Sequence, residues 1–270
     1  MKIPMLILTA LCFLLPITLP AQEAQWETYM GQYEKGPGST ILNMSIKNIA
    51  PVKDLPFLLV TGITFEKCTA DGLPEQEAFP QLYKVSEAVK RCVDSAEVNI
   101  FAGTFTYQCE RLDYYYIKDT AGIRKKLNKL YTDSFTGSKF YTNIKVDKIW
   151  QAYLDFLYPN ALSLEFMLNE KLLLKLKEAG DHLDKERPVN HLIYFTSEAD
   201  EQCFIPYVLK QHFKIAAKEK TDDLKHPFKL QISRTDKVDL PTISAITIDL
   251  KRMAMKCNGE YDGWETAVVK

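Results

Sequence analysis

The sequence predicts an α+β protein built from two domains, and three features lead to this prediction. Strand and helix patterns alternate irregularly from Trp26 to Pro159. A new helix pattern begins near Asn160, and few apolar stripes would be broken by a domain boundary there. After that helix, the order of patterns is β-α-β-β-α-β, the order of a ferredoxin-like sandwich. We therefore expect one domain over residues 22–160 and a second over residues 161–270.

The first 21 residues differ from the rest of the chain. Lys2 precedes an apolar run over residues 5–15, and prolines and the small residue Ala21 follow. This layout is typical of a secretory signal peptide that is cleaved near Ala21. The apolar run is too short to favour a permanent transmembrane helix. We expect a periplasmic or otherwise extracytoplasmic protein with no stable membrane span after cleavage.

In the first domain, strands are expected where apolar residues alternate or cluster, and helices where they return at helical spacing. The expected strands are Trp26–Tyr33, residues 41–46 after a GPGST turn, residues 58–65 and residues 139–146. Residues 99–118 predict a strand pair, or one long strand with a bulge at Gly103. The expected helices are residues 75–93, residues 123–131 and residues 149–158, the last capped by Asp147.

In the second domain, the leading helix carries a stripe of Leu162, Phe166, Leu173 and Leu176 and is closed by Gly180. The expected strands are residues 188–197, 213–218, 228–233 and 264–269. Two further helices are expected. Ser197 caps the first, which Pro206 should kink, and the second is an amphipathic helix over residues 240–257.

The segment GEYDGWET near the end of the chain is interpreted as a turn. Gly259 would end the last helix in the left-handed conformation, and Asp262 with Gly263 would turn the chain. Trp264 would begin the last strand and cover the end of the core.

Composition and motifs exclude several function classes. The formal net charge is -1, whereas nucleic-acid-binding surfaces normally carry a clear basic excess, so we expect no nucleic-acid partner. The sequence has no GxGxxG, Walker or GxSxG motif. We therefore expect no cofactor, no metal and no catalytic residue.

Three groups of residues are candidate sites. His182 and His191 lie near acidic residues, but their spacing is unlike a metal site, and a solvated turn is favoured. Cys109 could be a thiol nucleophile, yet nothing in the sequence orients a base toward it. The run from Asp113 to Tyr116 could stack a ligand, but a strand with alternate rings buried explains it better.

Removal of the first 21 residues leaves an odd number of cysteines: Cys68, Cys92, Cys109, Cys203 and Cys257. Most are expected to act as small buried hydrophobic residues. In a β-α-β-β-α-β unit the two helices run antiparallel on one face. This arrangement brings Cys203 close to Cys257, and export would permit a disulfide between them.

The second half resembles the bacterial regulators of ribonuclease E activity, type B, over roughly residues 165–270. The residues that carry the resemblance are Gly180, Asp181, Arg187, Pro188, His191, Tyr261, Asp262, Gly263 and Trp264. The resemblance implies a protein that binds and inhibits another protein without catalysis of its own. Pro206 and the signal peptide depart from that family, and an exported chain would not meet a cytoplasmic ribonuclease.

The first half resembles the bacterial domain of unknown function numbered 695. The resemblance rests on Trp26 and Tyr29, the GPGS turn, the strand with Gly62, and the segments GLP, GTFTYQ and WQAYLDFLYP. It supports a domain boundary near Asn160 and implies no activity.

Together these observations favour an exported, non-catalytic, regulatory protein whose partner is an unidentified extracytoplasmic protein. The motif residues are expected to be structural or partner-binding, with Arg187 pairing with Asp181 or Asp262. Two alternatives stay open. One is an exported hydrolase-like enzyme with a site in the cleft between the domains, and the other is a structural protein of the cell envelope.

Overall fold

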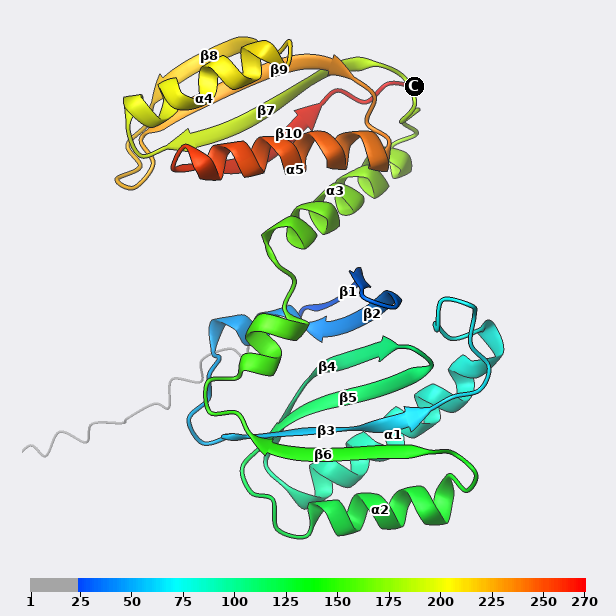
Figure 1. The fold of residues 1–270 in the computed structure, drawn as a ribbon. Helices are drawn as coiled ribbons and strands as arrows, with labels where there is room; N and C mark the ends of the chain where they lie inside the picture. Colours follow the sequence, from blue (N-terminus) through cyan, green and yellow to red (C-terminus); the bar gives the residue numbers. More distant parts are fainter. Residues whose placement is uncertain (1–23) are drawn as a thin grey trace, which may run out of the picture.

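The computed structural model describes residues 24–270, which form two antiparallel sheets with helices (Figure 1). The sheet orders are β1-β2-β4-β5-β3-β6 in the N-terminal half and β10-β7-β9-β8 in the C-terminal half. The predicted α+β class is confirmed. The predicted signal peptide lies outside the described residues. Within the described residues, no helix combines the length and the apolar character that crossing a bilayer requires.

The N-terminal sheet consists of β1 (Trp26–Tyr33), β2 (Gly36–Asn43), β3 (Phe57–Thr64), β4 (Asn99–Tyr107), β5 (Glu110–Ile117) and β6 (Phe140–Val146). The helices of this half are α1 (Phe79–Ala96), α2 (Ile123–Ser134) and the short helices η1 (Met44–Asn48), η2 (Gln76–Ala78) and η3 (Ala152–Leu157). The strand pair predicted for residues 99–118 is β4 and β5, and their register shifts beside Gly103.

Helices cover one face of the N-terminal sheet and part of the other. Helices α1 and α2 pack on one face, where Tyr115 lies, while η3 and the residues before it cover part of the other. On that second face Tyr116 stacks on Trp150 with ring centroids 3.8 Å apart. The prediction that only alternate rings of this run are buried is therefore wrong: Tyr114, Tyr115 and Tyr116 are all buried.

The GPGST segment is part of strand β2 and is not the predicted turn; the turn lies at residues 34–35. A Cβ atom at Gly38 would lie 2.8 Å from the ring of Tyr33 and 2.9 Å from that of Phe105. The glycine thus lets two aromatic rings pack across the strand. The strand predicted for residues 41–46 ends early, because Asn43 caps η1 by accepting a hydrogen bond from the amide of Ser45.

The C-terminal sheet consists of β7 (Arg187–Phe195), β8 (Lys214–Lys220), β9 (Phe228–Asp236) and β10 (Gly259–Thr266). Its helices are α3 (Ala161–Glu178), α4 (Glu198–Lys210) and α5 (Leu240–Lys256). The order after α3 is the predicted β-α-β-β-α-β, with α4 and α5 on the same face of the sheet (Figure 1). Helix α4 includes Pro206 and continues beyond it.

The interpretation of GEYDGWET as a turn is wrong. Strand β10 runs without interruption from Gly259 to Thr266, and its register against β7 shifts between Tyr261 and Gly263. The left-handed residue after α5 is Asn258, with φ at 51°. Gly259 serves a different purpose, since a Cβ atom there would lie 2.5 Å from the ring of Phe195. Asp262 is the extra residue of a β-bulge.

Two disulfides are present in the described residues, Cys68–Cys109 and Cys203–Cys257. The expectation that most cysteines act as small hydrophobic residues is therefore wrong, and Cys109 has no free thiol that could act as a nucleophile. The Cα atoms of Cys203 and Cys257 lie 5.7 Å apart. Among residues 24–270, Cys92 has a free thiol.

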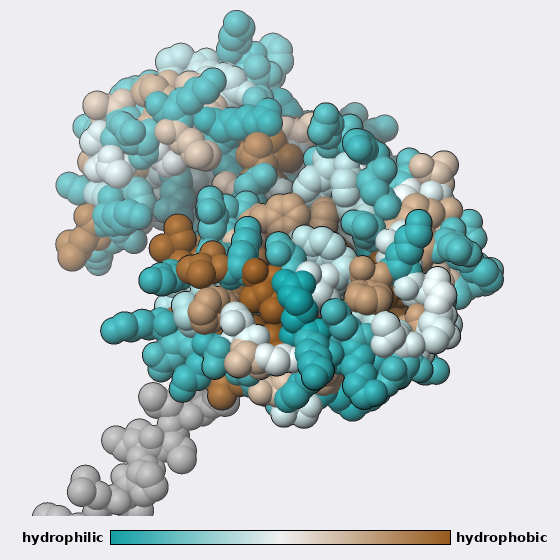
Figure 2. Space-filling view, turned by 60° about the horizontal axis from the view of Figure 1, so that its bottom comes forward, coloured by the Kyte–Doolittle hydropathy of each residue, from teal (hydrophilic) through white to brown (hydrophobic). Residues whose placement is uncertain are grey.

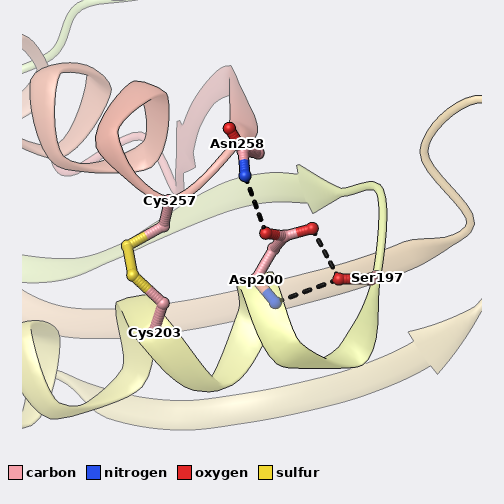
Figure 3. The surroundings of a disulfide bond; sticks show 5 residues. All are labelled: Ser197, Asp200, Cys203, Cys257 and Asn258. Carbon is pink, nitrogen blue, oxygen red and sulfur yellow. Dashed lines mark hydrogen bonds between the residues drawn. A yellow bond between two sulfur atoms is a disulfide. The ribbon is translucent and has the colours of Figure 1, made fainter.

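A polar link reinforces the second disulfide (Figure 3). Asn258, next to Cys257, donates a hydrogen bond of 3.0 Å to Asp200 at the start of α4. Hydrogen bonds from Ser197, Thr196 and Asn258 lower the pKa of Asp200 to about 2. The start of α4 and the end of α5 are thus joined by a covalent bond and by an ionised, hydrogen-bonded carboxylate.

Candidate partner-binding site

Arg187 and Asp181 form a buried ion pair that closes the loop between α3 and β7. Arg187 also donates hydrogen bonds to the backbone oxygens of Lys185, at 3.1 Å, and His182. The same Asp181 oxygen that pairs with Arg187 accepts a 2.8 Å hydrogen bond from the amide of Val269. Of the two partners predicted for Arg187, the structure selects Asp181, and the pair fixes the C-terminal tail to this loop.

The surroundings of Asp181 favour its charged form. Burial alone would raise the pKa of this carboxyl, but the hydrogen bonds from Arg187 and Val269 and the positive charge of Arg187 outweigh burial and lower the pKa. The carboxylate is therefore ionised at neutral pH and serves as a structural anchor.

His191 lies on the inner face of β7 and is completely buried. Its Nδ1 atom shares a 2.8 Å hydrogen bond with the hydroxyl of Tyr261 on β10, and its Nε2 atom has no partner among the described residues. Burial first, and the nearby charge of Arg234 second, lower the pKa of His191 to about 3. His191 is thus a neutral, enclosed core residue, and among residues 24–270 no group of three or more His, Cys, Asp or Glu side chains is arranged to hold a metal ion.

A polar network that the sequence patterns did not predict holds Trp264 in place. Its Nε1 atom donates a 2.7 Å hydrogen bond to the side-chain oxygen of Asn169 on α3. The amide nitrogen of Asn169 donates in turn to Thr247 at 2.7 Å and to Ser244 at 3.3 Å, both on α5. A buried tryptophan needs an acceptor for its N–H, which is the signal that points to a polar residue on a neighbouring helix.

The motif residues of β10 also form one wall of a groove of about 400 Å³ between α3 and the sheet edge. Its lining comprises Glu165, Leu168, Asn169, Lys171, Leu172 and Lys175 of α3, together with Leu192, Asp262, Gly263, Trp264 and Glu265. Of these, Asp262 and Gly263 belong to the β-bulge. The bulge thus places two motif residues at the surface, whereas Arg187 and His191 are buried and Trp264 contributes a largely buried ring to the groove wall.

The groove has apolar residues at its centre and charges around it. Leu168 is 58 % exposed, and Leu172 and Leu192 are half-buried beside it. Exposed lysines and acids surround these leucines. An apolar centre with a charged rim is the usual anatomy of a protein–protein interface. The predicted stripe on this helix was partly wrong: Phe166 is 39 % exposed, and Met167 is buried in its place.

Family comparisons match both halves of the chain. Residues 24–158 match a family of unknown function, DUF695. The chain belongs to this family, DUF695. Residues 167–266 match the family described as regulator of ribonuclease activity B, RraB. A comparison with curated proteins finds no match. Both resemblances predicted from the sequence are confirmed, and the RraB-like region supports a regulatory, protein-binding role.

Proposed function

We propose that this DUF695 protein is an exported, non-catalytic regulator that binds another protein through its RraB-like region. The observation that carries the proposal is the groove between α3 and β10. It lies in the region that matches a regulator family, has an exposed apolar centre, and takes part of its wall from the motif residues Asp262, Gly263 and Trp264. The buried motif residues support this groove: Trp264 holds β10 to α3, His191 holds β7 to β10, and Arg187 holds the loop between α3 and β7.

Two disulfides among the described residues support export. Disulfides form and persist in oxidising compartments and are rare in the cytoplasm. Each of the two joins segments that are distant in sequence, with separations of 41 and 54 residues. Together with the signal-peptide pattern of residues 1–21, they favour an extracytoplasmic partner over a cytoplasmic ribonuclease.

Fractionation of the native host tests the location. The protein is expected in the extracytoplasmic fraction, with the mass of a chain that begins near Gln22. Four of its cysteines should be protected from alkylation until a reductant is added. A full-length chain in the cytoplasm that still carries residues 1–21 would contradict export and make a cytoplasmic ribonuclease the first partner to examine.

Capture from the extracytoplasmic fraction tests the binding role. The mature protein is the bait, and Leu168→Glu, which places a charge in the apolar centre of the groove, is the test variant. Leu224→Glu is the matched control, because Leu224 is fully exposed in the loop between β8 and β9. The wild type and the control should capture the same protein, and Leu168→Glu should lose it. Equal capture by the wild type and both variants would contradict the groove as the binding site. A ligand or metal that remains bound through purification would instead favour an enzyme.

A further inference from the structure

The N-terminal sheet carries a second, larger hollow that the proposed function does not use. It has a volume of about 680 Å³ and lies on the sheet face opposite α1 and α2, between η3 and strand β6. The sheet contributes Leu58, Val60, Glu110, Leu112, Tyr114, Tyr141, Asn143, Lys145 and Val146, and the opposite wall contributes Asp147, Gln151, Ala152, Asp155 and Phe156. The hollow exists because η3 covers only part of this face.

Strand register explains why these side chains share one face. Across β5, β3 and β6, Tyr114 lies opposite Val60 and Val60 opposite Asn143. Two residues further along, Leu112 and Tyr141 both face Gly62. Gly62 contributes no side chain, and a Cβ atom there would lie 1.9 Å from the backbone oxygen of Arg111. Close approach of β3 to β5 therefore requires glycine, which leaves space between Leu112 and Tyr141.

Aromatic rings line this hollow. Tyr141 is 46 % exposed and Phe156 is 38 % exposed, so both rings are accessible to a ligand. Tyr114 packs beside Phe156 with ring centroids 6.0 Å apart. Tyr114 is more than nine-tenths buried. Burial first, and then the nearby Tyr141, Tyr33 and Glu110, raise the pKa of Tyr114, so the hydroxyl stays neutral.

The charges around the hollow are predominantly negative and unpaired. Glu110 and Asp155 are exposed, and neither forms an ion pair within residues 24–270. Asp147 is already occupied, since it accepts hydrogen bonds from Tyr116 and from the amides of residues 151 and 152. Lys145 supplies one positive charge beside Asp147, in the row that also contains Leu58 and Tyr116. Glu110 lies at the opposite end of β5, three such rows away.

Aromatic faces and free carboxylates together attract one class of ligand. A cation over the face of a tyrosine or phenylalanine is stabilised by the ring quadrupole, and carboxylates add charge-assisted hydrogen bonds. We propose that the hollow between β6 and η3 binds an organic cation, an ammonium or guanidinium group on an apolar stem. The stem lies against Val60, Leu112 and Phe156, and the charged group lies toward Glu110 and Asp155. The cation is either a free small molecule or the side chain of a lysine or arginine in a bound protein.

Titration calorimetry of the mature protein tests this inference with three probes. Spermidine represents a free cation, N-acetyl-arginine amide represents a protein side chain, and N-acetylglucosamine is the neutral comparison. The test variants are Glu110→Gln and Tyr141→Ala. Their matched controls are Glu178→Gln, an exposed acid at the end of α3, and Tyr83→Ala, a half-exposed ring on α1.

Saturable binding of at least one cationic probe is expected, weakened roughly fivefold or more by each test variant and unchanged in each control. Tighter binding of spermidine would identify a free small molecule as the source of the cation, and tighter binding of the arginine derivative would identify a protein side chain. The inference is overturned if neither cation binds saturably, if the controls weaken binding as much as the test variants, or if only the neutral sugar binds. Thermal unfolding of each variant shows that the fold is retained.

Discussion

At the scale of single residues, buried polar contacts explain most of the family-motif residues. His191 with Tyr261 and Trp264 with Asn169 join segments that are distant in the chain, and Asp181 with Arg187 closes the loop between α3 and β7. Each contact is buried, so the loss of one partner leaves the other without compensation, which costs more than the net value of the contact. The buried motif residues thus maintain the geometry of the groove, and Asp262 and Gly263 are the motif residues that the β-bulge places at the surface.

Replacement of Trp264 measures one of these contacts. Trp264→Phe retains an aromatic ring but removes the N–H that Asn169 accepts, and this change should lower the free energy of unfolding by about 1–3 kcal/mol. Trp264→Ala also removes the ring and should cost about 3–5 kcal/mol. Urea unfolding followed by circular dichroism gives both values. A loss below about 1 kcal/mol for Trp264→Ala would mean that the ring contributes to partner binding and not to the core.

His191 predicts a pH dependence of stability. Its pKa is about 3 in the folded protein and about 6.5 in an unfolded chain, so between these values the unfolded state binds more protons. The free energy of unfolding should therefore fall as the pH decreases from about 6.5, by up to roughly 1.4 kcal/mol per pH unit. The pKa of Asp181 is lowered in the folded protein, so protonation of this carboxyl also decreases stability, but only at pH values near or below the ordinary pKa of aspartate.

Urea unfolding at pH 7 and at pH 4.5 measures this dependence. His191→Gln retains a polar group opposite Tyr261 but does not titrate, so its decline between the two pH values should be shallower than that of the wild type. Equal declines for the two proteins would contradict the assignment of His191 as a buried, neutral residue.

At the scale of elements, apolar periodicity predicted strands and helices well where local pattern and packing agree. Strand β1 and helix α5 follow their patterns closely. Two of the failures occur at glycines. Gly38 and Gly259 suggested a turn and a helix cap, but each lies in a strand where a side chain would collide with aromatic rings of neighbouring segments. The need for such a close approach depends on residues far away in sequence, so a local pattern does not contain it.

The groove was predictable only in part. The motif residues of β10 came from the resemblance, and Trp264 was correctly expected to be buried. Leu168 and Asn169 were missed because α3 is apolar on most of its faces, so its periodicity does not show which face contacts α5. The hollow beside β6 was missed because it depends on the register of three strands.

The disulfide between α4 and α5 gives an element-scale prediction. Cys203 and Cys257 enclose a long segment, and the chain-entropy model assigns such a cross-link about 4 kcal/mol. The double variant Cys203→Ser/Cys257→Ser should therefore unfold the C-terminal sheet at clearly lower denaturant concentration, with a loss of about 2–4 kcal/mol. Cys92→Ser, which breaks no disulfide, is the control. An unchanged midpoint in the double variant would show that the bond does not stabilise this unit.

At the scale of the whole molecule, two sheets share few contacts. Met167 of α3 belongs to the N-terminal core, and Lys171 of the same helix pairs with Glu27 on β1. Most other contacts of α3 are with α5. On the face that Figure 2 shows, hydrophilic residues predominate and hydrophobic residues gather in small groups. The contacts of α3 favour two folding units, with α3 belonging mainly to the second.

We predict that residues 162–270 fold alone. Their apolar clusters, disulfide and polar networks are formed within the segment, with only minor contributions from the N-terminal half. The isolated polypeptide should unfold cooperatively and give dispersed amide signals in a nuclear magnetic resonance spectrum. A disordered polypeptide would contradict the boundary near Asn160 and make the two halves a single cooperative unit.

Site-specific cross-linking in the living host tests the central claim most directly. A photo-reactive amino acid is placed at position 168, in the centre of the groove, or at position 224, in the exposed loop between β8 and β9. Position 168 is expected to form a cross-link to one extracytoplasmic protein after illumination, whereas position 224 is not. Absence of a cross-link from position 168, or the same cross-links from both positions, would contradict a partner-binding groove between α3 and β10.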